Sequence, residues 1–245
     1  MFKYFMTFQP DIPEGIGFAQ FSMTHLVFLG LLILIDIYIV RCYLRSNSQQ
    51  QTHMRWTIGG LIFALEFLRQ AYLALTGQYN PSVMPFHLCG LGIFIVAFDT
   101  IKPNNTTREL LYSLTIWGAF AALLFPDWTY YPAMNIWTWQ SFLIHALLIV
   151  YPLMLLISKQ FVPNWHRLWR SIIFVAICVP FVYWLNGLFG TNFWFLNTAA
   201  GGSPLTALQN MFGPYYPLSL IVCLLILWFI MYLPWAIVAH KRPHR

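Results

Sequence analysis

Seven long apolar stretches constrain this chain more than any other feature of its sequence. Each is long enough, or nearly long enough, to cross about 30 Å of hydrocarbon, and they lie at residues 21–43, 55–76, 86–101, 108–125, 136–158, 168–188 and 216–239. Only 8% of the 245 residues are charged, whereas a soluble domain carries about 25%. The sequence therefore predicts an all-α membrane protein in which residues 1–245 form one integral membrane domain, a seven-transmembrane-helix bundle.

Basic residues alternate between the loops of this bundle. Loops 77–85, 126–135 and 189–215 contain none. The loops after the first, third and fifth stretches and the C-terminal tail contain Arg41, Arg45, Arg55, Lys102, Arg108, Lys159, Arg167, Arg170, Lys241, Arg242 and Arg245. Lysine and arginine accumulate on the cytoplasmic side of a membrane. We therefore expect a multi-pass protein with its N-terminus outside and its C-terminus cytoplasmic, and no nucleic-acid partner despite the net charge of +6.

The stretch Pro85-Phe86-His87-Leu88-Cys89 joins a polar loop to the third apolar segment. Proline suits the first turn of a helix, so we expect Pro85 to begin the helix and Cys89 to lie one turn in. The positive end of the helix dipole favours a thiolate there. His87 lies two residues away and should face nearly the opposite side, so another segment would have to supply a base. The other cysteines, Cys42, Cys178 and Cys223, are interpreted as small apolar residues, and no metal or cofactor site is predicted.

Several polar residues fall in the outer half of the predicted bundle. Glu66 and Arg69 are three residues apart on one helix face, so they can pair, either to fix packing or to hold a substrate head group. His145 and His25 are buried histidines that serve either as packing residues or as bases. Asn186 and Asn192 can donate amide hydrogens to an oxyanion or head group, or act as cap and turn residues.

The remaining acidic residues are interpreted more simply. Asp127 follows Pro126 and is typical of a turn. Asp99 should extend toward Lys102 at the inner end of its helix. Asp36 has no partner nearby in the sequence, which favours a position on an ion or proton path.

Polar groups from five predicted helices at one depth suggest a cavity open to the outer side. A thiol, imidazoles and amide donors fit nucleophilic acyl chemistry. The alternative is a small-molecule or ion transporter or a receptor-like sensor that uses the same cavity, and a structural subunit of a larger membrane complex is a third possibility.

Two stretches resemble a known family. Pro85-Phe86-His87-Leu88-Cys89 and Gly190-Thr191-Asn192-Phe193-Trp194-Phe195-Leu196, with Asp127 and His145 in matching order between them, resemble the YwaF-like bacterial integral membrane proteins. In the common family form the second stretch contains Asn-Tyr-Met-Phe-Leu, so Phe193 and Trp194 replace tyrosine and methionine here. The resemblance implies a bacterial plasma membrane location and distant kinship with eukaryotic cysteine-dependent phospholipid acyltransferases.

These observations together predict a membrane-embedded lipid acyltransferase or acyl hydrolase that acts on membrane lipids without a cofactor. The resemblance assigns the nucleophile to Cys89. His145 is the first candidate for the base and His25 the second, with His87 orienting the site. Substrate-binding roles are expected for Arg69, Glu66, Asn186 and Asn192.

Overall fold

The computed structural model describes residues 3–9 and 11–240, and over this part of the chain the regular structure is helical. The long helices are α1 (Met23–Arg45), α2 (Ser48–Leu75), α3 (Leu88–Ile101), α6 (Ile136–Ile157), α7 (Trp169–Phe189) and α9 (Tyr216–His240). Three shorter helices are α4 (Asn105–Leu110), α5 (Ile116–Leu124) and α8 (Pro204–Phe212). Lys241, Arg242 and Arg245, on which part of the orientation prediction depends, lie outside the described residues.

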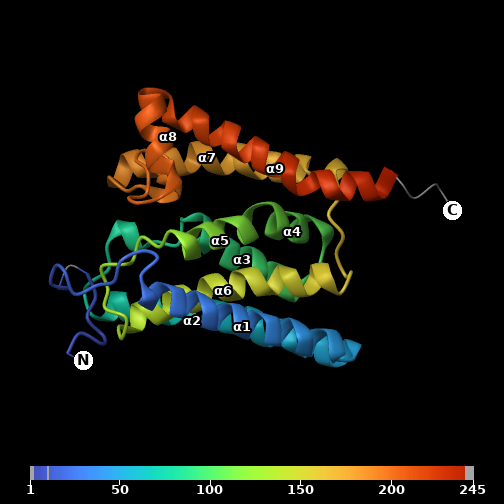
Figure 1. Ribbon diagram of the computed structural model, residues 1–245, viewed down its shortest axis with the longest axis horizontal. Helices are drawn as coiled ribbons and strands as arrows, with labels where there is room; N and C mark the ends of the chain where they lie inside the picture. The colour runs from blue at the N-terminus through green and yellow to red at the C-terminus, as the bar shows by residue number, and fades with distance from the viewer. Residues whose placement is uncertain (1–2, 10, 241–245) are drawn as a thin grey trace.

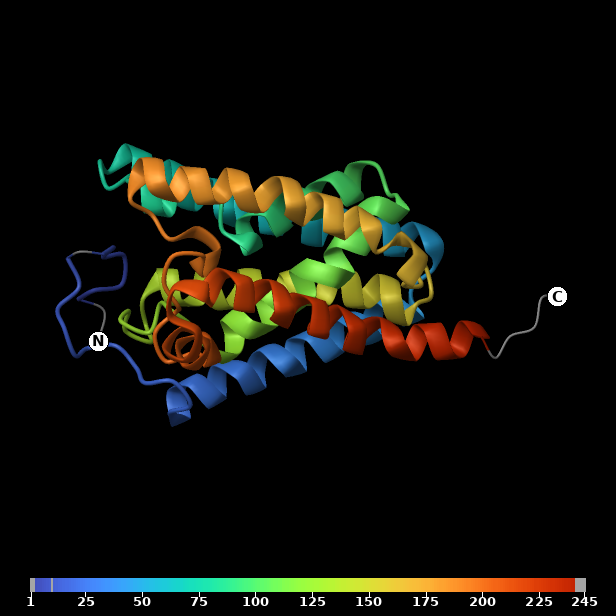
Figure 2. The same cartoon turned by 90° about the horizontal axis from the view of Figure 1, so that it is seen from above.

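The helices form two layers that lie beside each other (Figure 1). Helices α1 to α6 form one layer, and α7, α8 and α9 form the other. From above, α7 and α9 lie over different parts of the first layer (Figure 2). The three loops without basic residues, 77–85, 126–135 and 189–215, lie at the same end of the molecule as the N-terminal segment. The C-terminal end of α9 lies at the opposite end.

The all-α prediction is confirmed, and the seven predicted spans are supported in part. Five helical segments are long and apolar enough to cross a membrane: Met23–Arg45, Ser48–Leu75, Ile136–Ile157, Trp165–Phe189 and Pro204–Val238. The third predicted span is a helix of only 14 residues, about 21 Å at 1.5 Å per residue. The fourth is interrupted by a π-helical segment. Which side of a membrane each end faces stays a prediction.

Helix α6 is the centre of the first layer. Buried residues make up 61% of its most apolar 18-residue window, against 17–28% for the other four candidate spans. It packs most extensively on α1 and α5 and also contacts α2 and α3. Side chains on α6 are therefore held by neighbours on several sides, which makes this helix a rigid support for His145.

Helix α2 begins seven residues before the predicted start at residue 55. The reason is local: the Asn47 side chain accepts a hydrogen bond from the Gln50 N–H, and the Gln50 side chain accepts one from the Asn47 N–H. This reciprocal cap satisfies two N–H groups that a helix end otherwise leaves unpaired. The polar residues after Ser48 therefore extend the helix beyond its apolar part.

A π-helix, Leu111–Thr115, joins α4 to α5 and forms the main polar joint between the layers. The Ser113 hydroxyl lies 2.7 Å from the Ser171 hydroxyl of α7. The Trp228 indole of α9 donates to the Ser113 carbonyl at 3.0 Å, and the Tyr112 hydroxyl donates to the Met231 carbonyl at 2.9 Å. Because a π turn alters the regular i→i−4 ladder, it leaves the Ser113 carbonyl available to the second layer.

The N-terminal segment covers the loop between α5 and α6. The Asn135 amide donates to the carbonyls of Tyr4 and Thr7 at 2.7 and 2.9 Å, and the Phe18 N–H donates to the Thr129 carbonyl at 2.9 Å. Gly17 is required at this contact, because a Cβ there would overlap the Thr129 carbonyl. The segment thereby closes one side of the cavity described below.

Candidate functional site

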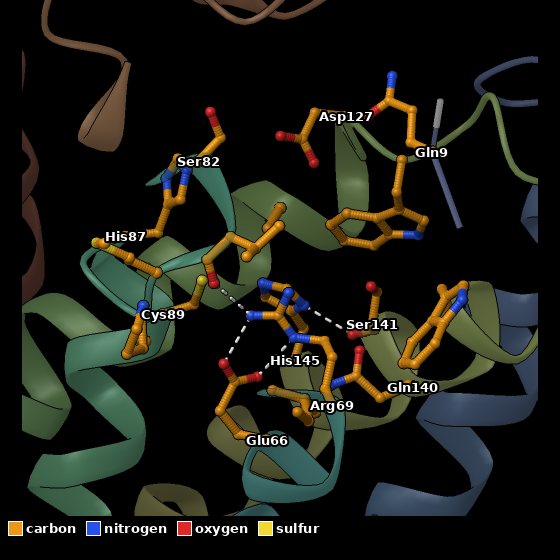
Figure 3. Close-up of a pocket in the computed structure, with 18 of the residues that line it drawn as sticks. Gln9, Glu66, Arg69, Ser82, His87, Cys89, Asp127, Gln140, Ser141 and His145 are labelled. Carbon is orange, nitrogen blue, oxygen red and sulfur yellow. Dashed lines mark hydrogen bonds and ion pairs between the residues drawn. The ribbon is translucent and has the colours of Figure 1, made fainter. Parts of the chain in front are cut away.

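A cavity of about 600 Å³ opens at the end of the first layer that carries the N-terminal segment. Its walls come from α2, α3, α5 and α6, from the loops before α3 and α6, from Phe195 in the loop after α7, and from the N-terminal segment. The polar side chains that line it (Figure 3) are Gln9, Glu66, Arg69, Asn80, Ser82, His87, Cys89, Asp127, Tyr130, Tyr131, Gln140, Ser141 and His145. Five of the eight predicted site residues therefore share one cavity: Cys89, His145, His87, Arg69 and Glu66.

Cys89 lies in the first turn of α3, as its second residue. Pro85 does not begin this helix, contrary to the expectation: the chain turns between Met84 and Phe86, and His87 is the N-cap residue. Gly90 permits the turn, because a Cβ there would overlap the Pro85 carbonyl. The Cys89 side chain points toward the space beside Arg69 and His145 (Figure 3), and its sulfur makes no side-chain hydrogen bond within the described chain. A buried thiol stays protonated until a base takes its proton, so the thiolate predicted from the helix dipole is not favoured here.

His145 is held in one tautomer by the backbone of its own helix. Its Nδ1 lies 2.7 Å from the Ser141 carbonyl oxygen, and because a carbonyl only accepts, Nδ1 carries the proton. Nε2 is then the unprotonated nitrogen of the neutral ring, and no other described residue bonds to it. The Trp128 indole stacks on the imidazole at 5.0 Å and 18°, which fixes the plane of the ring. This arrangement leaves a free, oriented proton acceptor.

The predicted pair of Glu66 and Arg69 is formed. Arg69 Nε and Nη2 donate to the two carboxylate oxygens at 2.9 and 2.6 Å, and Nη2 also donates to the Val83 carbonyl at 3.2 Å. The two formal charges therefore offset each other. Of the three guanidinium nitrogens only Nη1 makes no hydrogen bond to a described residue, so Arg69 offers the cavity the two N–H groups of one nitrogen rather than a full fork.

His87 lies in the loop before α3, between two aromatic rings of the second layer. Its ring centroid is 5.1 Å from Phe193, edge to face, and 5.7 Å from Phe195. Burial, with a smaller contribution from the nearby charge of Arg69, lowers the pKa of His87 to about 4. The ring is therefore neutral at pH 7 and is a poor proton acceptor, which suits the orienting role predicted for it.

His25 is not brought into the cavity. The Phe21 N–H donates to its Nδ1 at 2.9 Å, so Nε2 carries the proton and donates to the Leu123 carbonyl at 2.9 Å. Both ring nitrogens of this fully buried side chain are thus occupied. The contacts of His25 join the start of α1 to the end of α5, which is a packing role.

Asn186 and Asn192 also lie outside the cavity lining. The Asn186 carbonyl oxygen accepts from the Phe193 N–H and the Thr191 hydroxyl, and its amide donates to the Phe193 carbonyl. Asn192 bonds to Asn197 and Thr198 in the same way. Both amides are occupied within the loop after α7, so neither is free to contact a substrate.

Ser141 and Asp127 are among the polar residues of the cavity that the sequence analysis does not predict as site residues. Ser141 fixes the His145 tautomer through its backbone, which no side-chain pattern can reveal. Asp127, interpreted as a turn residue, lines the cavity mouth. Asp99 was expected to extend toward Lys102. It lies outside the cavity and instead contacts Arg108, Thr107 and Tyr151.

Comparison with known families gives one match. The TMEM164 family model matches residues 20–232, which covers both landmark stretches and the whole cavity except the N-terminal segment. No curated protein and no solved structure matches the chain. The finer assignment to YwaF-like proteins stays a prediction.

Proposed function

The chain belongs to the TMEM164 family of membrane proteins, and we propose that it is a lipid acyltransferase or acyl hydrolase in which Cys89 carries the acyl group. The family is related to lipid acyltransferase-like families. The observation that supports the proposal most strongly is that Cys89 and His145 line one cavity from two different helices and that Nε2 of His145 is left unbonded. A nucleophile and an oriented base are the parts that acyl transfer requires.

The first half-reaction uses these groups directly. His145 Nε2 takes the thiol proton while the Cys89 sulfur attacks the ester carbonyl of a lipid. The tetrahedral oxyanion is stabilised by Arg69 Nη1 and by the unpaired N–H groups of the first turn of α3. When the ester C–O bond breaks, protonated His145 gives its proton to the leaving alkoxide. A lyso-lipid leaves and a thioester remains on Cys89.

The second half-reaction reverses these roles. A lipid hydroxyl or a water molecule gives its proton to His145 Nε2 and attacks the thioester carbonyl. Breaking the C–S bond releases the thiolate, which takes the proton back from His145. Transfer to a hydroxyl makes the protein an acyltransferase, and transfer to water makes it a hydrolase.

The place of the cavity fits a lipid substrate. It lies at the end of the bundle where the loops lack basic residues, which the distribution of lysine and arginine assigns to the outer side. Acyl ester bonds lie just below the lipid head groups, and with this orientation we expect the first turn of α3 to lie at that level. Membrane lipids of the outer leaflet are therefore the proposed substrates.

Transport is the second candidate, and Asp36 is the residue that favours it. Its Oδ1 is buried without a hydrogen bond among the described residues. Asp36 does not line the cavity, whose inner lining includes the apolar residues Gly90, Ile93 and Ile144. An enzyme should therefore keep its activity in an Asp36→Asn variant, whereas a transporter should lose transport.

The proposal is tested with purified protein and mixed phospholipids in nanodiscs. Release of lyso-lipid and of transferred or free acyl chain is followed by mass spectrometry. We expect Cys89→Ser to lower the rate by at least about 100-fold, whereas Cys178→Ser, a matched change in α7, leaves it unchanged. Turnover that survives Cys89→Ser contradicts the proposal.

A further inference from the structure

The loop after α7 holds the start of the Cys89 helix through one side chain. The Trp194 indole N–H donates to the Phe86 carbonyl at 2.8 Å, across 108 residues of sequence. Phe86 lies three residues before Cys89, in the turn that leads into α3. Other contacts from this loop to the turn are apolar: Phe193 packs on Phe86 and His87, and Phe195 packs on His87.

The backbone of this loop has an unusual conformation. Trp194 has φ 59° and ψ 10°, and Phe195 has φ 54°. Large side chains rarely adopt the left-handed region, and two in succession persist only where their surroundings compensate the strain. Here the compensation comes from Asn186, whose side chain makes three hydrogen bonds to Thr191 and Phe193. The conformation directs the Trp194 indole to Phe86 and Phe195 to the cavity wall.

We propose that Trp194 is a positioning residue: by bonding to Phe86 it fixes the turn that aims the Cys89 thiol into the cavity. Trp194 itself does not line the cavity, whereas Phe195 does. It therefore acts through Phe86 and His87 rather than on a substrate. Trp194→Met removes the hydrogen-bond donor while it keeps apolar bulk.

The first test needs no lipid and is independent of the proposed function. In a full-length chain with Cys42, Cys178 and Cys223 changed to alanine, the alkylation rate of Cys89 by iodoacetamide is measured in detergent. Losing one hydrogen bond to a carbonyl should free the turn, so we expect Trp194→Met and Trp194→Phe to change this rate by at least about threefold. Amide exchange of residues 86–92 should accelerate, with the other helices unaffected. The control is Trp184→Phe, a change at an exposed α7 side chain.

The second test rests on the proposed function and separates positioning from general packing. With acyl-transfer turnover as the readout, the Trp194 variants should lower kcat by about tenfold at an unchanged KM, with a melting temperature close to that of Trp184→Phe. The inference is overturned if the Trp194 variants match Trp184→Phe in the alkylation rate of Cys89, in the amide exchange of residues 86–92 and in kcat. If the parent protein transfers no acyl group, the proposed function fails, and alkylation and exchange still decide the role of Trp194. A Trp194 variant that does not fold is replaced in all assays by Asn186→Asp, which loosens the same loop from α7.

Discussion

The two ends of the helical bundle differ in how their buried polar groups are hydrogen-bonded. At the end away from the cavity, Asp99 is fully buried but bonds to Thr107, Tyr151 and Arg108 at 2.7, 3.1 and 3.3 Å. Glu109, also fully buried, accepts from Tyr232 at 2.7 Å and pairs with Arg167 at 3.0 Å. These carboxylates connect α3 and α4 to α6, η3 and α9, where η3 is the 3₁₀ turn Trp165–Arg167.

At the cavity end the groups that chemistry needs are left free. His145 Nε2 and Arg69 Nη1 have no hydrogen-bond partner among the described residues, and the Cys89 sulfur has no side-chain partner there, although each is close to groups that fix its orientation. A buried charge without a partner is costly, so a folded protein pairs its structural ions. The difference between the ends teaches that the paired carboxylates stabilise the fold, whereas Cys89, His145 and Arg69 keep groups available to the cavity; Asp36, unpaired outside the cavity, is an exception.

The largest effect that sharpens this comparison is expected at His145. His145→Gln keeps a polar side chain of similar size but removes the proton acceptor, so kcat for acyl transfer should fall by about 10²–10⁴-fold. The melting temperature should change little, because Nε2 bonds to no described residue. Lipid turnover and thermal unfolding of the same preparation check both statements. A loss of activity accompanied by a large fall in melting temperature would show that His145 is a packing residue.

The opposite outcome is expected at the other end. Glu109→Ala leaves the Arg167 charge without its buried partner and should lower the free energy of unfolding by about 3–5 kcal/mol. Protein that stays folded at low temperature should keep its kcat. Equilibrium unfolding in mixed micelles measures the first quantity and lipid turnover the second. A stable Glu109→Ala protein that has lost activity would break the division between the two ends.

A smaller effect on activity is expected at Gly90. A methyl group there would push on the Pro85 carbonyl, so Gly90→Ala should move the turn before α3 and lower kcat by about 10–100-fold. Gly60, which has open space around its Cβ position, is the matched control in α2. Turnover by both alanine variants is compared at saturating lipid. An unchanged Gly90→Ala enzyme would mean that the position of this turn does not set the reaction rate.

The smallest effect concerns the dependence of stability on pH. His87 has a pKa of about 4 in the folded protein, below its ordinary value of 6.5, so the unfolded chain binds its proton first as the pH falls. The contribution of the neutral ring is complete above pH 6.5 and is lost progressively toward pH 4. The fall in melting temperature from pH 7 to pH 5 should therefore be smaller in His87→Gln than in the parent protein. His53→Gln, at an exposed histidine, should behave like the parent, and a His87→Gln curve that also matches the parent would contradict this.

The sequence predicts the helices well because apolar length decides them. The ends of α6 and α7 differ by one residue or less from the predicted bounds 136–158 and 168–188. The prediction of helix bounds fails where local hydrogen bonds override apolarity, as at the Asn47 cap that extends α2 and in the π-helix between α4 and α5. The short helix α8 was predicted as loop, because its nine residues have no extended apolar run.

The candidate site was predicted in part for a similar reason. His145, Arg69 and Glu66 are costly residues in apolar segments, and cost is visible in a sequence. Cys89 was predicted instead from its place in the first turn of a helix. His25 has the same cost, but its two ring nitrogens are satisfied by backbone groups of Phe21 and Leu123, and such contacts depend on how the helices pack. The roles of Ser141 and Trp128 beside His145 depend on the same packing.

The most direct test of the account is the capture of the acyl group on the protein. Parent protein is mixed with phospholipid, quenched in acid within the first turnovers, digested, and analysed by mass spectrometry. The account predicts one fatty acyl mass on the peptide that contains Cys89, sensitive to hydroxylamine and lost when an acyl acceptor is added before the quench. Two results together would contradict it: lipid turnover by the parent protein without any acyl mass on that peptide, and activity of the His145→Gln variant.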